Sequence, residues 1–271
     1  MNKVISIIMP TYNSERTIEE SLQSIRNQHF DQNKVEILIV DGGSTDNTIS
    51  IAEKYDCRII YNEKRLPEFA KQLGFEEALG EWGIFIDSDE MFLNMDSFAR
   101  RISLLEKYPS VKNLVSTGMS CDEKENDINR YANCVGDPFS RFVYQYNGYN
   151  RMETMRKKFP YKNIEEDAIF SFKRAKYYPL YDALGNMFHI PTARRLYEES
   201  GCNQNFVANI FVNMVEQTKY AAMLSDDFVM HKPGMNKKTY MDKLKWRVKN
   251  NLFKEEGVGF SGRKDSSNFL K

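Results

Sequence analysis

Apolar and polar residues alternate in blocks along the first third of the chain. Four short apolar runs, at 4–9, 35–40, 58–61 and 84–86, are each followed by polar residues. Such runs, with turn-forming residues at their ends, are typical of buried parallel strands. Between them, apolar residues recur at helical spacing, as in Ile18, Leu22 and Ile25 and again over 68–79. This alternation predicts an α/β fold with a mixed, mainly parallel sheet flanked by helices.

Polar side chains follow three of these strands where each one ends. Thr11 and Tyr12 follow the first strand, Asp41 follows the second, and Asp87 and Asp89 follow the fourth. In an open α/β sheet the carboxyl ends of parallel strands lie at one edge, where ligands bind. Two carboxylates one residue apart can hold Mg²⁺ or Mn²⁺, which usually also binds substrate phosphates. We therefore expect a divalent-metal site at this edge.

Charge is balanced over the whole chain but not along it. Lys plus Arg and Asp plus Glu both number 38, so the net charge does not indicate a nucleic-acid partner. Residues 232–254 nevertheless carry eight basic side chains against one acid, a net charge of +7. Because 255–271 carry three charges of each sign, residues 1–231 carry −7. An acidic body is thus followed by a basic tail.

The basic stretch 232–254 also has an apolar helical face. Met241, Leu244, Val248 and Leu252 recur three or four residues apart, among lysines. A basic amphipathic helix of this kind can lie on an anionic membrane surface. It can equally dock on an acidic patch of its own domain, and the sequence leaves both hypotheses open.

Cysteine spacing and the length of the apolar runs indicate the cellular location of the protein. Cys57, Cys121, Cys134 and Cys202 show no CxxC spacing, so we expect free thiols in a reducing compartment. The apolar run at the start is too short for a signal peptide, and no segment reaches the length of a transmembrane helix. These features predict a cytoplasmic protein, with the tail as its one candidate contact with the inner face of the membrane.

Three motifs together resemble glycosyltransferase family 2, whose members have the GT-A fold. They are IIMPTYN at 7–13, IVDGGSTDNT at 39–48 and GEWGIFIDSD at 80–89. Weaker likenesses follow in GNMFHIP at 185–191 and DFVMH at 227–231. Two positions depart from the family pattern. Gly42 stands where a second aspartate is common, and Lys71 replaces an arginine, keeping the charge but not the planar fork.

The resemblance implies a role for each residue of these motifs. The nucleotide would be bound by Pro10, Thr11, Tyr12, Glu15, Asp41, Lys71, Asp87 and Ser88. Within that set, Asp41 would hydrogen-bond the base. A divalent metal, Mn²⁺ or Mg²⁺, would be held by Asp87, Asp89 and His231.

The catalytic base is the one role that the resemblance does not fill. A carboxylate within hydrogen-bond reach normally takes the proton of the acceptor hydroxyl. In the family this is the aspartate of a Glu-Asp pair that precedes the closing histidine. Counting back 22–24 residues from His231 gives Asn209, Ala208 and Val207, none of which is a carboxylate.

Two alternatives for the base remain open. Glu166 and Asp167 form a Glu-Asp pair, and His189 follows Asp167 by 22 residues, which would make His189 the closing histidine. Otherwise a nearby acid such as Glu198, Glu199 or Glu216 would take the role, or the base would be absent.

The chain is therefore interpreted as a glycosyltransferase domain over 1–231, followed by the basic amphipathic tail 232–271. Within the domain, 1–110 form the nucleotide-binding half and 111–231 the acceptor-binding half. We expect sugar transfer from a nucleotide sugar to a glycan, polysaccharide or lipid-linked hydroxyl, with inversion and a divalent metal. UDP is favoured because a carboxylate at Asp41 fits a pyrimidine imide.

Two rival functions remain open. A non-catalytic nucleotide-sugar-binding relative that acts through partners is suggested by Asn209. A sugar-phosphate nucleotidyltransferase would need a glycine-rich, arginine-containing loop after the first strand, where residues 10–13 read Pro-Thr-Tyr-Asn.

Overall fold

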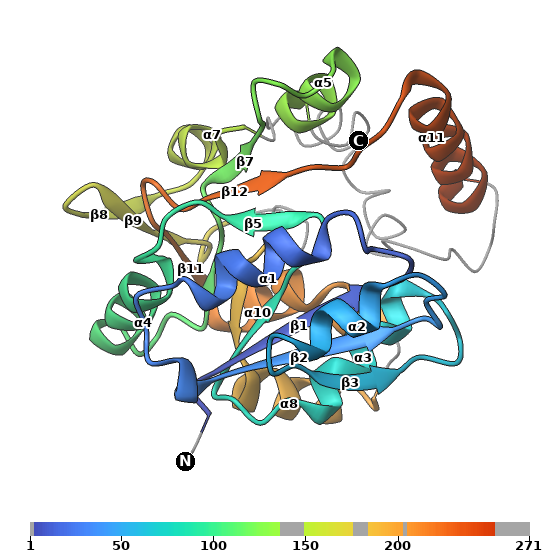
Figure 1. Ribbon diagram of the computed structural model, residues 1–271. Coiled ribbons are helices and arrows are strands. Elements are labelled where there is room, and N and C mark those ends of the chain that lie inside the picture. The colour runs from blue at the N-terminus through green and yellow to red at the C-terminus, as the bar shows by residue number, and fades with distance from the viewer. Residues whose placement is uncertain (1–2, 136–148, 176–183, 203–204, 253–271) are drawn as a thin grey trace.

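The computed structural model describes residues 3–135, 149–175, 184–202 and 205–252, and for 246–252 it describes the backbone (Figure 1). The part of the predicted tail beyond residue 252 lies outside these residues. Two sheets and the helices around them make up the described chain.

The larger sheet is mixed and has nine strands in the described part of the chain, in the order β3-β2-β1-β4-β10-β6-β11-β9-β8. Its strands are β1 (Ile5–Thr11), β2 (Val35–Asp41), β3 (Arg58–Tyr61), β4 (Trp82–Phe85), β6 (Asn113–Leu114), β8 (Tyr161–Ile164), β9 (Asp167–Ser171), β10 (Met187–His189) and β11 (Tyr220–Met223). The first four are parallel to one another, whereas β10 and β9 run antiparallel to their neighbours. The predicted fold class is confirmed.

Helices cover both faces of this sheet, which explains the nearly continuous apolar runs of its strands. The helices of the described chain are α1 (Ile18–Arg26), α2 (Thr48–Glu53), α3 (Pro67–Glu77), α4 (Ser97–Lys107), α5 (Asp127–Val135), α7 (Arg151–Lys158), α8 (Ile190–Glu199), α9 (Asn205–Ala208), α10 (Ile210–Thr218) and α11 (Lys237–Leu252), with a 3-10 turn at Gln32–Lys34. Successive residues of β1 point to opposite faces. Ile7 packs in the core beneath α1 and α4, and Ile8 packs in the core beneath α3, α8 and α10.

A second, three-stranded sheet lies across the first and closes the core above α1 and α4. It consists of β5 (Glu90–Phe92), β12 (Phe228–His231) and β7 (Gly118–Ser120), in the order β5-β12-β7. Its middle strand, β12, pairs antiparallel with β5, which sets His231 opposite Glu90. The small sheet therefore carries the end of β12 to the residues that follow β4.

A buried ion pair joins the two sheets. Arg101 of α4 and Asp227, just before β12, are 0% and 1% exposed, with Nε and Nη2 of Arg101 at 2.9 and 2.6 Å from Oδ2 of Asp227. Arg101 also donates to the Gly185 carbonyl before β10, and the hydroxyl of Ser97 donates to Asp227. The backbone N–H of Asp227 donates to the hydroxyl of Thr117, just before β7. The pair thus fixes where β7, β10 and β12 begin.

Asp227→Asn should destabilise the protein by about 3–5 kcal/mol, because it leaves the Arg101 charge buried without its counter-charge. Urea denaturation followed by circular dichroism measures this loss. The adjacent Asp226→Asn is a matched control, since Asp226 pairs with Arg100 at the surface and should cost at most about 1 kcal/mol. Equal losses in the two variants would contradict the role of burial.

Candidate functional site

The polar residues that follow β1 and β2 meet at the carboxyl edge of the large sheet, as the sequence predicts. The Thr11 hydroxyl donates to Oδ1 of Asp41 across 3.0 Å. Oδ2 of Asp41 accepts the backbone N–H groups of Gly43 and Ser44 at 2.8 and 2.7 Å, and the Ser44 hydroxyl donates to Oδ1. Asp41 is 1% exposed.

This arrangement changes the interpretation of Asp41. A carboxylate offers about four acceptor positions, and the protein already supplies four donors to this one. Asp41 therefore shapes the loop 42–44. A direct contact between its side chain and a base stays a prediction that these four bonds weigh against.

The loops after β1 and β2 are bonded to each other reciprocally. Oδ1 of Asn13 accepts the Thr45 N–H at 2.8 Å, and the Asn13 N–H donates to the Ser44 hydroxyl. Oε2 of Glu15 accepts from both the backbone and the side chain of Asn47. Glu15 and Tyr12 are both predicted to line a nucleotide pocket, but their surroundings in the structure differ. Glu15 ties the loops together, whereas Tyr12 is 57% exposed beside Gly42.

The residues that follow β4 lie next to the loop after β1. The Ser88 hydroxyl donates to the hydroxyl of Ser14 at 2.8 Å. Nζ of Lys71, on α3, lies 3.6 Å from Oδ1 of Asp87. Burial alone would lower the pKa of Lys71, but the carboxylates of Asp87, Glu90 and Glu68 outweigh it and raise that pKa. Lys71 is therefore a fixed positive charge facing a half-exposed carboxylate.

Asp89 and His231 form the other half of this cluster. Nε2 of His231 lies 3.5 Å from Oδ2 of Asp89, and the Lys232 N–H donates to the Asp89 carbonyl. Burial tends to raise the pKa of Asp89, but His231 and Lys243 outweigh it and the pKa is lowered. The other ring nitrogen of His231, Nδ1, is 2.7 Å from Oδ1 of Asn133. Sequence reasoning missed Asn133, because a polar residue on a helix is ordinarily solvated.

The Asp89–His231 pair fits part of a metal site. One carboxylate oxygen and one imidazole nitrogen face each other, and both are ligands of Mn²⁺. Among the described residues, no three His, Cys, Asp or Glu side chains converge closely enough to hold a metal alone. Asp87 faces Lys71 instead. A cation bound here would need further oxygen ligands, such as diphosphate oxygens and water.

Glu90 is a buried carboxyl beneath this cluster. It is 4% exposed, and its Oε2 accepts the backbone N–H of Asp87 at 3.0 Å. Burial, followed by repulsion from Asp87 and Asp89, raises the pKa of Glu90 well above its usual value. The side chain thus holds the turn between β4 and β5 in place.

The predicted base residues Asp167 and Glu166 are not brought to this cluster. β10, β6 and β11 lie between β9 and β4, a lateral distance of about 19 Å at the usual strand spacing. Asp167 instead accepts the Ser225 N–H at 2.8 Å and pairs with Arg100 at 3.3 Å. The backbone carbonyl of Glu166 accepts from Arg156. The geometry thus gives these two residues a structural role.

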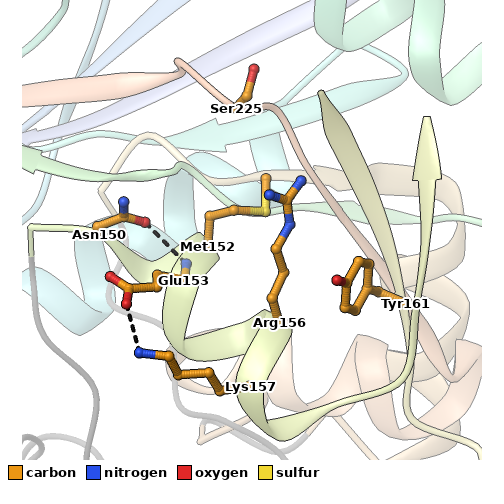
Figure 2. Close-up of a pocket in the computed structure, with 7 residues that line it drawn as sticks. All are labelled: Asn150, Met152, Glu153, Arg156, Lys157, Tyr161 and Ser225. Atoms are coloured by element: carbon orange, nitrogen blue, oxygen red, sulfur yellow. Dashed lines mark hydrogen bonds and ion pairs between the residues drawn. The ribbon is translucent and has the colours of Figure 1, made fainter. Parts of the chain in front are cut away.

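A pocket of about 560 Å³ borders the Asp167 region, between α7 and β8. It is lined by Asn150, Met152, Glu153, Arg156, Lys157, Tyr161 and Ser225 (Figure 2). Figure 2 shows the Arg156 side chain rising between Met152 and Tyr161, with Glu153 paired to Lys157. The guanidinium lies 5.6 Å from the Tyr161 ring centre. This polar pocket is separate from the Asp89–His231 pair.

The register that made His189 the closing histidine is wrong. His189 pairs with Trp82, the first residue of β4, and so lies at the opposite end of that strand from Asp87. Its Nδ1 accepts the Thr192 N–H and caps α8. In the other register the position of the base falls on Asn209. This residue lies just before α10 and next to α9, and α9 packs against α3, the helix of Lys71.

The tail begins as the predicted helix, α11, and its first turns contact the domain. The ring of Tyr240 packs edge-on against Tyr131 of α5 at 6.2 Å, and the charge of Lys243 acts on Asp89. Met241 is 43% exposed. No helix in the described ranges is both long and apolar enough to cross a membrane. All four cysteines are free thiols.

Comparisons with known proteins agree with the resemblance in the sequence. The family described as Glycosyl transferase family 2 matches residues 6–178. Poly(ribitol-phosphate) beta-N-acetylglucosaminyltransferase TarS of Staphylococcus aureus is 32% identical over 111 residues, which make up 39% of this chain and only 19% of TarS.

Two solved structures share the fold at low sequence identity. S. aureus TarS 1-349 in complex with UDP-GlcNAc has a TM-score of 0.58 at 18% identity, over 98% of this chain and 71% of that one. Glucosyl-3-phosphoglycerate synthase from Mycobacterium tuberculosis, in complex with Mn²⁺, UDP and glucosyl-3-phosphoglycerate, has a TM-score of 0.53 at 17% identity, over 96% and 82%.

Glu90→Gln should stabilise the metal-free protein increasingly as the pH rises above about 4.5, the ordinary pKa of a glutamate. A raised pKa means that the folded protein keeps a proton which the unfolded chain has lost, so the wild type loses stability between the two pKa values. Glutamine cannot titrate and still offers an oxygen to the Asp87 N–H. Urea denaturation at pH 5, 7 and 9 in EDTA measures the difference, with Glu77→Gln at the surface as the control. A difference that does not change with pH would contradict the raised pKa.

Proposed function

We propose that this chain, which belongs to glycosyl transferase family 2, transfers a sugar from a nucleotide-diphosphate sugar to an acceptor hydroxyl. The observation that carries the proposal is the pairing of Asp89 with His231 beside the pairing of Lys71 with Asp87, at the carboxyl edge of the sheet. A fixed cation and a half-formed metal site side by side suit a diphosphate, whose departure leaves negative charge to be stabilised.

In this proposal the nucleotide binds over the loops after β1 and β2. The exposed ring of Tyr12 and the backbone at Pro10 and Thr11 provide its walls, and Asp41 and Glu15 keep the two loops in register. A UDP-sugar is the favoured donor. The support is that two proteins sharing the fold have been solved with UDP-GlcNAc and with UDP.

We further propose that a divalent cation, Mn²⁺ or Mg²⁺, is held by Asp89 and His231 together with the donor diphosphate. The cation would offset the charge that develops on the leaving diphosphate. Lys71 and Ser88 would contact the diphosphate at its other side, with Asp87 fixing the position of the Lys71 ammonium group. One structural neighbour solved with Mn²⁺ and UDP supports this assignment.

The acceptor is proposed as a hydroxyl-bearing glycan or lipid-linked glycan, and the transfer as inverting. The name of TarS, a poly(ribitol-phosphate) beta-N-acetylglucosaminyltransferase, supports a polymeric acceptor. A second candidate function is nucleotide-sugar binding without transfer, because Asn209 occupies the family position of the base and an amide cannot take a proton at neutral pH. Release of UDP, with or without an added acceptor, distinguishes the two.

UDP with Mn²⁺ should stabilise the protein by about 2.7 kcal/mol at 100 times the dissociation constant, a rise of roughly 5–10 °C in Tm. Most of that rise should disappear in EDTA and in Asp89→Asn or His231→Ala, because the nucleotide and the cation share these ligands. Differential scanning fluorimetry with UDP, GDP, CDP and dTDP measures it.

A matched control for this experiment exists on the surface. His29 and Asp96 form an exposed pair, with Nδ1 and Oδ1 2.9 Å apart. His29→Ala and Asp96→Asn should leave the nucleotide-dependent rise intact. If no nucleotide raises the midpoint with metal, or if the control pair matters as much as Asp89 and His231, the proposed donor site is wrong.

The tail is proposed to contact an anionic membrane surface through the basic stretch 232–254. The side chains of Lys237, Lys238 and Lys245 are exposed on α11, and Met241 is partly exposed among them. The packing of Tyr240 on Tyr131 supports the other hypothesis, docking of the tail on its own domain, for the first turns of the helix.

Replacing Lys237, Lys238 and Lys245 together by Gln should weaken binding to vesicles rich in phosphatidylserine by roughly 100-fold, since each lysine near such a surface contributes about 1 kcal/mol. Vesicle co-sedimentation at low and high salt measures this effect. Lys54, Lys107 and Lys124, exposed on the body, provide a control triple of equal charge change. Equal weakening by both triples, or no binding by the wild type, would favour docking of the tail on the domain.

A further inference from the structure

Three asparagines, two on α5 and one directly before it, bind the chain that leaves β12. Asn126, Asn129 and Asn133 are spaced three and four residues apart. Asn126 Nδ2 donates to the Met235 carbonyl at 3.0 Å, and Asn129 Oδ1 accepts the Met235 N–H at 2.9 Å. Asn133 binds His231 twice, at its backbone carbonyl and at its ring, both at 2.7 Å. We call these three residues the asparagine ladder.

The hydrogen bonds of Asn133 determine which ring nitrogen of His231 carries the proton. A backbone carbonyl can only accept, so the group that Asn133 turns to the His231 carbonyl must be its NH₂ group. That leaves the amide oxygen, itself only an acceptor, facing Nδ1 of His231. The proton of a neutral His231 ring must therefore be on Nδ1, and Nε2 is left with a free electron pair.

The orientation of the ring shows which group the unprotonated nitrogen, Nε2, faces. Nε2 faces Oδ2 of Asp89 at 3.5 Å, and Asn133 is 1% exposed, so water does not compete for the amide. A metal-binding imidazole is normally held by a hydrogen bond from its other N–H, and loss of that bond costs roughly 10–100-fold in metal affinity.

We propose that Asn133 is a positioning residue. It holds His231 as the Nδ1–H tautomer and presents Nε2 to the cation shared with Asp89 and the donor diphosphate. This proposal rests on the proposed function, because the tautomer affects metal binding only if His231 binds the cation. Asn126 and Asn129 hold Met235 and do not touch the ring.

The first experiment reads the tautomer in the metal-free protein, independently of any activity. Long-range ¹H–¹⁵N spectra distinguish Nδ1–H from Nε2–H imidazoles, and the chain has only three histidines. The signals that are missing from the spectrum of His231→Ala are those of His231. At a pH at which the ring is neutral, we expect Nδ1–H at His231 in the wild type and a mixture of tautomers in Asn133→Leu. An Nε2–H ring in the wild type would overturn the proposal, even if Asn133→Leu does not fold.

The second experiment measures Mn²⁺ affinity in the presence of UDP, from the electron paramagnetic resonance signal of free Mn²⁺. Asn133→Leu should weaken Mn²⁺ binding by roughly 10–100-fold. Asn133→Asp keeps an oxygen facing Nδ1–H but loses the donor to the His231 carbonyl, so it should weaken Mn²⁺ binding less than Asn133→Leu does. Asn126→Ser, which removes the ladder bond to the Met235 carbonyl, can still cap α5 and does not touch the ring, is the matched control.

The two experiments separate the failure of this proposal from that of the proposed function. If wild-type protein binds no Mn²⁺ with UDP, the donor site is wrong, while the tautomer still tests what Asn133 does to His231. If the wild type binds Mn²⁺ and Asn133→Leu binds it equally well, Asn133 does not position the metal ligand. Equal losses in Asn133→Leu and Asn126→Ser would show that the ladder supports the structure and does not position the metal ligand.

Discussion

The buried pairing of Arg101 with Asp227 is the contact on which the geometry of the site depends. Neither charge is exposed, so each needs the other and the hydrogen bonds around them. Because Asp227 directly precedes β12, the pair sets where that strand begins, and four residues later the strand ends at His231. The Asp89–His231 pair at one end of the small sheet is thus positioned by an ion pair at its other end.

The site itself divides into a rigid part and an open part. The loops after β1 and β2 satisfy each other's polar groups, with the Asp41 carboxylate fully occupied. Lys71, Asp87, Asp89 and His231 instead face each other at distances longer than close hydrogen bonds. Charged groups held apart on a rigid frame are arranged to receive a ligand that is itself charged.

The parts of the fold that the sequence predicts are those governed by local periodicity. The strand at 58–61 and its parallel neighbours lie where their apolar runs place them, and so does the helix over 68–79, within two residues at each end. The small sheet escaped prediction because β5 and β7 have three residues each, too few to show a pattern. The role of Asp167 could not be decided from the sequence, because a Glu-Asp pair looks the same whether it faces a substrate or an arginine. Asn133 gave no signal, since only the strand opposite it shows that the helix face is buried.

The asparagine ladder also has a mechanical consequence. α11 begins two residues after Met235, whose backbone is held by two ladder bonds, and Arg16 lies so close over Gly234 that a Cβ atom there would be 1.5 Å from the guanidinium. A force applied to α11 would therefore load the bonds at Met235 before it reached His231. The anchor at Met235 therefore protects the position of the imidazole from a movement of the tail, whereas the charge that Lys243 exerts on Asp89 would move with the helix.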